Sequence, residues 1–458
     1  MGDVTGVGNR SGSAGVGRRL ADICGADFAR PAGAADEVAG QPARWVALPG
    51  SPRAVGDILR LAAEYDLSVV PRGAGTKLDW GAPPAQLDIL LDTGRLAGVW
   101  HRSTGELTAE VGAGTPVRAV QAVLERSGQR LAIDVPSEGA TVGGVVAADE
   151  SGPLRHRHGS SCAQVTEVSY VDAGGALNRI GGRSASPDAR RELAALLCGS
   201  HGALGVLVSA TLRVQAVPAS RLWVTRSVWT PLEMHDLVGE ILSGSIAPAA
   251  IEIDLPGGQQ YASWRVAGAA DGSWQGSGHP AGTGRPRPSG PRGPGTLAVL
   301  IEGGPSDVAE RVGRLGRLLG GDARTSAAPP AWWRQYPFGP ADIALRIEVP
   351  IGDLHAAVYA LRDAAGTPLP VRGSAGLGVV HAALPATTPP DRVAGILTAV
   401  RAVLLARAGR CVVVAAPPPV RRSVDLWGDR SDLSLLRRVK EQFDPDHRLA
   451  PGRFPGGL

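Results

Sequence analysis

After residue 44, apolar and polar side chains alternate in two different patterns, one typical of strands and one typical of helices. Apolar runs at residues 44–48 and 67–71 predict two strands. Residues 51–65 between them have apolar side chains every three to four positions, which predicts an amphipathic helix. Ser51 is placed to cap that helix, because its hydroxyl can accept a hydrogen bond from a backbone N–H of the first turn. The pattern therefore predicts a strand–helix–strand unit that ends just before a glycine-rich loop.

The strand and helix patterns both continue along the chain and predict a mixed α+β fold. Further strands are expected at residues 87–91, 106–111, 165–171, 205–214, 222–228, 250–255, 297–302 and 344–349. Further helices are expected at residues 116–127, 189–198, 231–242, 306–319, 353–365, 389–408 and 431–442. Two stretches break the pattern. The Gly- and Ser-rich start predicts a flexible lead over residues 1–39, and residues 267–295, with almost no aliphatic side chains, predict a disordered insertion.

Composition favours a large folded protein with more than one domain. Of the 458 residues, 43% are hydrophobic and 20% are charged, which is enough apolar material for a core. The formal net charge is +4, and the basic residues do not gather into blocks interleaved with aromatic ones, so no nucleic-acid partner is expected. No apolar run has the length that a bilayer requires, and no transmembrane segment is expected.

The four cysteines, Cys24, Cys162, Cys198 and Cys411, lie far apart and include no Cys-x-x-Cys pair. This spacing is not that of a zinc site or of an iron–sulfur cluster, so no metal is expected. We interpret the cysteines as free thiols in a reducing compartment, which predicts a cytoplasmic protein.

Residues 71–77 (Pro-Arg-Gly-Ala-Gly-Thr-Lys) have the features of an anion-binding loop that follows a strand. Two glycines permit positive φ angles, which turn successive backbone N–H groups toward one point. Arg72 and Lys77 add positive charge, and Thr76 adds a hydroxyl. We predict a pyrophosphate cradle, with an ordinary tight turn as the alternative. The loop lacks the Gly-Lys-Ser/Thr ending of a P-loop and the helix-opening third glycine of the Rossmann fingerprint.

A second group of small residues follows at residues 136–148, with Ser151-Gly152 and Gly159 just beyond. Small side chains let a flat ligand lie directly against the backbone. Two such loops in one α+β domain indicate a dinucleotide ligand.

Four motifs together resemble the vanillyl-alcohol oxidase/p-cresol methylhydroxylase-type FAD proteins, and among these the FAD-binding subunits of bacterial glycolate oxidases. The motifs lie at residues 71–77, 111–116, 140–145 and 440–445.

The resemblance implies a two-part FAD-binding domain at residues 40–218 and a smaller α+β cap or substrate domain at residues 219–427. A C-terminal tail at residues 428–458 would pack back on the FAD domain.

The resemblance also implies a set of FAD-binding residues. They are Pro71, Arg72, Gly73, Ala74, Gly75, Thr76, Lys77, Gly81, Pro136, Gly139, Ala140, Thr141, Gly143, Gly144, Ser151, Gly152, Gly159, Gly205 and Val206. Some family members attach FAD to a histidine at the position of Thr76, or to a cysteine in the second loop, which has none here. The resemblance therefore implies non-covalent FAD.

The sequence departs from the family pattern at two places near the cofactor. Residues 162–163 are Cys-Ala where the family usually has Arg-Asp, and residues 184–192 keep the length of a family loop but not its chemistry. These departures leave an alternative open: a divergent structural subunit that keeps the fold with weak or no FAD.

In the second domain, residues 372–381 resemble the Gly-His-x-Gly-Asp-Gly-x-x-His segment of catalytic glycolate and lactate flavoenzymes, but only His381 remains. One imidazole is a poor divalent-metal site. His381 is a candidate base, with a structural histidine at a strand end as the alternative. Arg346 is a candidate carboxylate ligand, and a surface ion pair with Glu348 is its alternative reading.

The resemblance implies the FAD-binding subunit of a glycolate-oxidase-like 2-hydroxyacid dehydrogenase complex. It would relay electrons from a small hydroxy acid to a partner and be active only in the complex. The implied partners are a second flavin subunit and an iron–sulfur subunit, and any membrane association would come through such partners.

Overall fold

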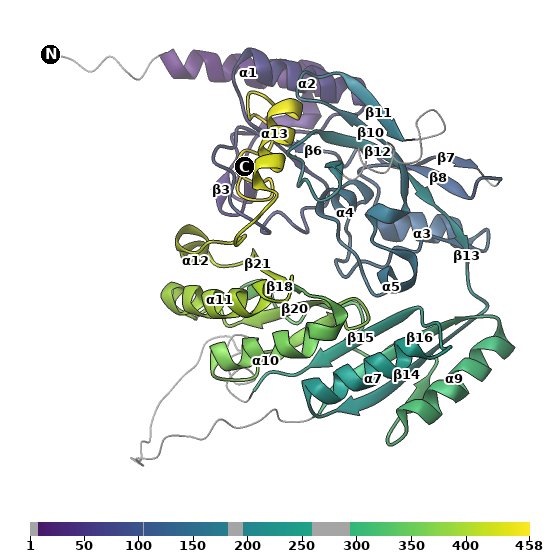
Figure 1. Cartoon of the computed structure of the whole chain (residues 1–458). Helices are drawn as coiled ribbons and strands as arrows, with labels where there is room; N and C mark the ends of the chain where they lie inside the picture. The colour runs from purple at the N-terminus through teal and green to yellow at the C-terminus, as the bar shows by residue number, and fades with distance from the viewer. Residues whose placement is uncertain (1–7, 104, 182–195, 259–293) are drawn as a thin grey trace, which may run out of the picture. The chain divides into compact units, whose positions relative to one another are not determined.

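The computed structural model describes residues 8–103, 105–181, 196–258 and 294–458. The chain divides into two compact units, one made of residues 1–217 with residues 429–458, and the other of residues 218–428 (Figure 1). Each unit combines helices with antiparallel or mixed sheets, so the predicted α+β fold class is confirmed.

The first unit contains two main sheets. A four-stranded sheet has the order β1-β4-β6-β5, in which β4, β6 and β5 are parallel, and a five-stranded antiparallel sheet has the order β11-β10-β12-β8-β7. Its strands are β1 (Ala29–Pro31), β2 (Glu37–Val38), β3 (Gln41–Pro42), β4 (Trp45–Ala47), β5 (Val69–Arg72), β6 (Ile89–Asp92), β7 (Val99–Ser103), β8 (Thr108–Gly112), β9 (Gln129–Arg130), β10 (Val165–Val171), β11 (Leu177–Gly181), β12 (Val206–Arg213) and β13 (Gln215–Ala216). Its helices are α1 (Gly8–Cys24), α2 (Pro52–Glu64), α3 (Val117–Glu125), α4 (Val142–Ala148), α5 (Arg155–His158) and α13 (Leu433–Phe443).

The predicted strand–helix–strand unit is present as β4, α2 and β5. Ser51 caps α2, because its Oγ accepts a hydrogen bond from the backbone N–H of Ala54 at 3.2 Å. The apolar face of α2, which includes Ile58 and Leu59, is fully buried. This packing fixes the end of β5, from which the first glycine-rich loop departs.

The prediction of a flexible lead over residues 1–39 is wrong for the residues that the structure describes. Gly8–Cys24 form α1, and Val16, Leu20 and Cys24 are buried in the core that also contains α2 and β4. These three side chains recur every four residues, which is the period of a helix face. Glycine and serine around them hide that period in the sequence.

The C-terminal residues return to the first unit through α13. Lys440 of this helix and Asp444, which follows its last residue, form a fully buried ion pair at 2.6 Å. The Lys440 ammonium also donates to the carbonyls of Ala203 and Leu449, and Leu449 forms a parallel bridge with Val69 at the start of β5. The C-terminal segment is therefore tied to the strand that leads into the first loop.

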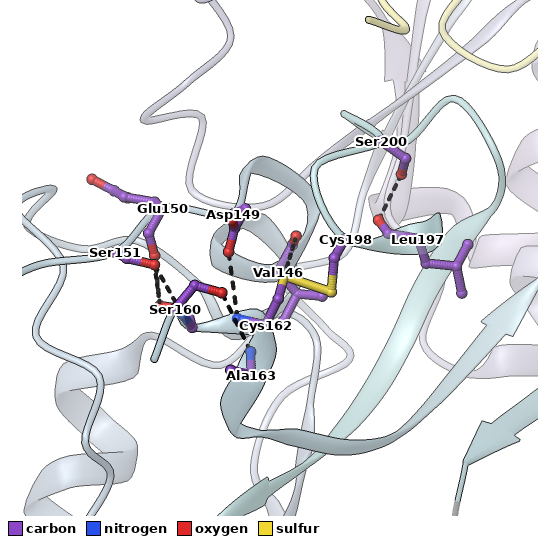
Figure 2. Close-up of a disulfide and its surroundings, with 11 residues drawn as sticks. Val146, Asp149, Glu150, Ser151, Ser160, Cys162, Ala163, Leu197, Cys198 and Ser200 are labelled. Atoms are coloured by element: carbon purple, nitrogen blue, oxygen red, sulfur yellow. Dashed lines mark hydrogen bonds between the residues drawn. A yellow bond between two sulfur atoms is a disulfide. The ribbon is translucent and has the colours of Figure 1, made fainter. Parts of the chain in front are cut away.

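The expectation of four free thiols is wrong for two cysteines. Cys162 and Cys198 form a disulfide with their Cα atoms 6.0 Å apart, while Cys24 and Cys411 are free and buried (Figure 2). The two bonded cysteines are 36 positions apart in the sequence. They meet because both of their loops fold onto the C-terminal end of α4, at the carbonyl of Val146.

The second unit is built on one antiparallel sheet of eight strands in the order β17-β14-β16-β15-β19-β20-β18-β21. The strands are β14 (Ser220–Val228), β15 (Ala250–Leu255), β16 (Gly295–Gly303), β17 (Arg324–Ser326), β18 (Ile343–Glu348), β19 (Val371–Ser374), β20 (Val379–Leu384) and β21 (Arg410–Ala415). The helices are α7 (Pro231–Ser243), α9 (Pro305–Leu319), α10 (Leu354–Ala365), α11 (Pro390–Leu405) and α12 (Pro418–Ser423). Helices α7, α9 and α11 contact the sheet, and α10 packs against α7 and α11.

Two sequence predictions fall partly or entirely outside the described residues. The expected insertion at residues 267–295 does so up to residue 293, and Gly295 already begins β16. The altered segment at residues 184–192 lies outside them entirely. Within the described part of the chain, no helix has both the length and the apolar character needed to cross a membrane.

Candidate cofactor site

The first unit contains a pocket of about 790 Å³, part of which is open to solvent. It lies where the first glycine-rich loop meets α4 and the turn that precedes β12. The pocket is lined by Val70, Pro71, Arg72, Gly73, Ala74, Gly75, Thr76, Lys77, Leu78, Thr93, Ala113, Thr141, Gly143, Gly144, Ala147, Ala148, Ser200, His201, Gly202, Gly205, Leu207 and Arg453.

Most of the first-loop and α4 residues singled out from the sequence line this pocket together. They are Pro71, Arg72, Gly73, Ala74, Gly75, Thr76, Lys77, Thr141, Gly143, Gly144 and Gly205. The others do not line it, namely Gly81, Pro136, Gly139, Ala140, Ser151, Gly152, Gly159 and Val206. Two of these have evident structural roles: Gly152 leaves no room for a Cβ beside the carbonyl of Asp134, and the Val206 side chain is buried in the core.

The turn at residues 200–202 was missed by sequence reasoning, although it lines the pocket. Its signal is Gly202, which has φ of +77° and a missing Cβ that would lie 3.0 Å from the ring of Pro71. Arg453 was missed as well. Its guanidinium donates to the carbonyls of Trp80 and Ala82, more than 370 residues earlier in the chain.

Glycines bring the loops of the pocket into close contact. A Cβ on Gly73 would lie 2.1 Å from Oγ1 of Thr141, the residue that caps α4 by accepting a hydrogen bond from the Gly144 N–H. A Cβ on Gly143 would lie 2.7 Å from the Cβ of Ala113. Larger side chains at either glycine would force these loops apart.

The first loop presents free backbone donors. Among the residues that the structure describes, the backbone N–H groups of Gly73, Ala74, Gly75 and Thr76 donate to no acceptor. Gly75 has φ of +78°, which an L side chain adopts only with strain. Four successive donors without acceptors and a positive φ angle are features of an anion-binding nest.

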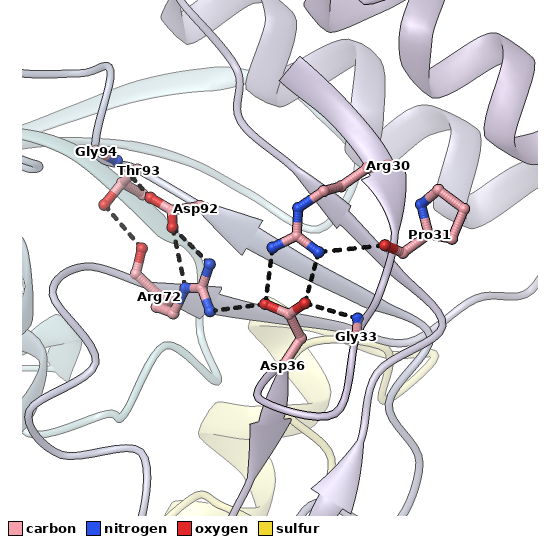
Figure 3. A network of polar contacts seen from close by, with 8 residues as sticks. All are labelled: Arg30, Pro31, Gly33, Asp36, Arg72, Asp92, Thr93 and Gly94. Carbon is pink, nitrogen blue, oxygen red and sulfur yellow. Dashed lines mark hydrogen bonds and ion pairs between the residues drawn. The ribbon is translucent and has the colours of Figure 1, made fainter. Parts of the chain in front are cut away.

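The positive charge of Arg72 is already balanced by two carboxylates (Figure 3). Its guanidinium lies 2.8 Å from an Asp92 oxygen and 3.3 Å from an Asp36 oxygen. Asp36 also receives two hydrogen bonds from Arg30, at 2.6 and 3.0 Å. The Arg30 hydrogen bonds are the largest influence on the Asp36 carboxyl and lower its pKa to about 2.

Lys77 is balanced in the same way. Its ammonium lies 2.8 Å from a Glu150 oxygen, contacts Ser137 Oγ and sits 4.4 Å from the ring centroid of Trp80. Burial lowers the pKa of Lys77. Arg72 and Lys77 are thus both paired with carboxylates, and the backbone N–H groups of residues 73–76 are the anion-binding feature of the loop.

The candidate catalytic residues lie on the sheet of the second unit. Arg346, His381, Arg372 and Asp254 are cross-strand neighbours along one row of β18, β20, β19 and β15. A row of this kind places the four side chains on the same face of the sheet.

Both arginines in this row are paired. Arg346 lies 2.5 Å from Glu348, so the predicted ion pair is confirmed, and Arg372 lies 2.8 Å from Asp254. The His381 ring stands edge-on to Tyr336, with ring centroids 4.9 Å apart. In the described part of the chain, no group of three or more His, Cys, Asp or Glu side chains is arranged to hold a metal ion.

Comparison with known proteins identifies the domain that forms the pocket. Residues 43–181 match the family described as FAD binding domain. The chain is 30% identical to the D-lactate dehydrogenase of Archaeoglobus fulgidus over 37% of its length and 38% of that protein. It is 30% identical to the glycolate oxidase subunit GlcE of Escherichia coli over 40% of its length and 51% of that protein. The matches thus span about half or less of these two relatives.

Two further matches extend over nearly the whole chain. An FAD-linked oxidoreductase of Mycobacterium tuberculosis is 26% identical over 91% of this chain and 92% of its own length. The structure of 4-ethylphenol oxidase from Gulosibacter chungangensis superposes with a TM-score of 0.65, at 15% identity, over 97% of both chains. At this identity the structural likeness shows the fold alone.

The matched domain binds FAD, and the chain has the fold of the vanillyl-alcohol oxidase/p-cresol methylhydroxylase-type flavoproteins. Residues 43–181 are thus an FAD-binding domain of a kind that these dehydrogenases and oxidoreductases also resemble, and the cofactor of this domain is FAD. The sequence-based resemblance and the FAD prediction are confirmed.

Proposed function

We propose that FAD lies in the pocket of the first unit with its pyrophosphate against residues 73–76. The single observation that carries this proposal is the set of four backbone N–H groups without acceptors in that loop. Thr141, Gly143, Gly144 and Gly205 would lie along the rest of the cofactor. Bound FAD would supply the redox chemistry, since flavin accepts the two electrons that an alcohol loses on oxidation.

The ion pairs of Arg72 and Lys77 would support pyrophosphate binding by residues 73–76 without contacting the phosphates. By holding both ends of the loop they keep its N–H groups converged before the cofactor arrives, so less ordering entropy is lost on binding. Because carboxylates balance the charges of Arg72 and Lys77, the loop would select the pyrophosphate through the directions of its backbone N–H groups.

We further propose that the chain takes part in oxidising a small 2-hydroxy acid and relays the electrons to partner subunits. The support is its similarity to a D-lactate dehydrogenase and to a glycolate oxidase subunit. A second flavin subunit and an iron–sulfur subunit are the proposed partners, and the proposed location is the cytoplasm.

A catalytic partner is required by this proposal because the second unit offers an incomplete constellation. Removing hydrogen from a 2-hydroxy acid needs a base near the carbinol and a cation on the carboxylate. Arg346 is already paired with Glu348, and Arg372 with Asp254. His381 is the remaining candidate base, without the aspartate and second histidine of the related catalytic segment.

The test is an anaerobic absorbance experiment on the full chain loaded with FAD. Glycolate or D-lactate should leave the oxidised flavin band in place over minutes, whereas dithionite should bleach it, which shows that the flavin is present and reducible. Bleaching within seconds by either acid, lost in His381→Ala, would show that the chain is an autonomous dehydrogenase and would overturn the need for a partner.

A further inference from the structure

The disulfide between Cys162 and Cys198 lies directly behind the wall of the FAD pocket. Helix α4 forms that wall, since Thr141, Gly143 and Gly144 at its start and Ala147 and Ala148 at its end all line the pocket. Both cysteine loops are fastened to the C-terminal end of this helix (Figure 2).

The loop that follows Cys198 is part of the pocket itself. The Gly199 N–H donates to the Val146 carbonyl at 3.1 Å, and the His201 N–H donates to the Ala147 carbonyl at 2.8 Å. Ser200, His201 and Gly202 then line the pocket. Cys198 therefore lies just before the residues of this loop that line the pocket.

The loop that contains Cys162 reaches the first glycine-rich loop through a chain of polar contacts. The Ser161 hydroxyl donates to the Glu150 carbonyl at 2.6 Å, and the Ser161 N–H donates to Ser151 Oγ at 2.8 Å. The Glu150 carboxylate in turn holds Lys77 at 2.8 Å. A movement of Cys162 would thus displace residues on both sides of the pocket.

The four cysteines differ in accessibility. Cys162 and Cys198 are only partly buried, whereas Cys24 and Cys411 are buried in the cores of their units. Burial raises the pKa of the Cys411 thiol to about 12 and also raises that of Cys24. A reductant or oxidant in solution therefore meets the pair and not the two buried thiols.

We propose that Cys162 and Cys198 form a reversible thiol–disulfide site that controls how tightly the chain holds FAD. The disulfide fixes residues 199–202 against α4 and so keeps the pocket in its binding shape. Reduction removes this covalent tie and leaves the loop with its non-covalent contacts, so FAD must order it on binding and is held more weakly. The inference rests on the proposed position of FAD in this pocket.

The switching reaction balances with a dithiol as reductant. A thiolate of the dithiol attacks one sulfur and breaks the S–S bond to form a mixed disulfide, and the other cysteine leaves as a thiolate. The second thiol of the reductant then displaces the remaining cysteine and closes a cyclic disulfide. The protein gains two electrons and two protons as two cysteine thiols, and the dithiol loses them.

The test compares FAD binding by the oxidised and reduced forms of the full wild-type chain. Thiol titration of the denatured protein should count two free cysteines before dithiothreitol treatment and four after it. The dissociation constant for FAD, measured from the quenching of flavin fluorescence, should rise by about tenfold on reduction, within the usual range for coupled sites. The dissociation constant should return to its original value when the thiols are reoxidised.

Variants separate the pair from the other cysteines. Cys162→Ser/Cys198→Ser should bind FAD weakly in both conditions, and Cys24→Ala/Cys411→Ala should keep the full response to dithiothreitol. Equal FAD affinity of the oxidised and reduced wild-type chain would overturn the proposal, as would four free thiols in the oxidant-treated protein. If neither the oxidised nor the reduced chain bound FAD, both the proposed FAD position and the proposed thiol–disulfide control would be overturned.

Discussion

Substitution of Gly75 tests whether the first loop is an anion cradle or only a turn. Gly75 has φ of +78°, and a Cβ there would meet nothing closer than Leu78 at 3.5 Å. Gly75→Ala therefore adds backbone strain of about 1–2 kcal/mol without a steric clash. A free loop can relax that strain but a loop closed around pyrophosphate cannot, so FAD affinity should fall by roughly 5- to 30-fold.

Gly75→Asp adds a negative charge to the same strain. A carboxylate about 5 Å from a phosphate charge, at an effective dielectric constant of about 20, costs about 3 kcal/mol. This repulsion alone lowers affinity by more than about 100-fold. FAD titration of the purified chain, followed by flavin fluorescence, should therefore rank the wild type first, then Gly75→Ala, then Gly75→Asp.

Gly128→Ala is the matched control. Gly128 also has a positive φ, +64°, its missing Cβ would meet nothing within 4 Å, and it does not line the pocket. Any strain that this substitution adds lies outside the pocket, so FAD affinity should be unchanged. Folded Gly75→Asp with wild-type affinity would refute the cradle and leave the loop as a turn.

Three further predictions concern the cofactor bond, the Asp36 network and the C-terminal helix. Because Thr76 cannot form a histidyl–flavin bond, acid or heat should release FAD quantitatively, and flavin that stays with the chain on a denaturing gel would contradict this. The pKa of Asp36, lowered to about 2, corresponds to about 2 kcal/mol of stability that is present above about pH 4 and lost as the pH falls toward 2. Asp36→Asn should thus unfold at lower urea concentration than the wild type near pH 7, with a smaller gap near pH 3; an equal gap at both would count against the network. Lys440→Met leaves the buried Asp444 carboxylate without its ammonium partner and should cost about 3 kcal/mol in urea unfolding. Arg19→Met, which breaks the exposed pair with Glu64, should change nothing measurable, and equal effects of the two variants would contradict the account.

Local signals in the sequence predict the frame of the site well. The Ser51 cap and the helical period after it place α2 within one residue at each end, and this also locates the strand that leads into residues 71–77. The glycines of that loop point to converging N–H groups because positive φ is a local property of the chain. For these elements neighbouring residues contain the necessary information.

Features that join distant segments are not visible in the sequence pattern. The pairing of Cys162 with Cys198 depends on two loops that meet at one carbonyl of α4, and no spacing rule predicts it. Arg453 and the turn at residues 200–202 enter the pocket through tertiary packing. The balance of charge at Arg72 depends on Asp36, which comes from a separate hairpin.

The most direct test of the account is an experimental structure of the full chain with FAD bound. The two phosphates of FAD should lie within hydrogen-bond distance of the backbone N–H groups of residues 73–76. Arg72 should remain on Asp92 and Lys77 on Glu150. FAD bound elsewhere, or phosphates held by the Arg72 and Lys77 side chains after those ion pairs break, would contradict it.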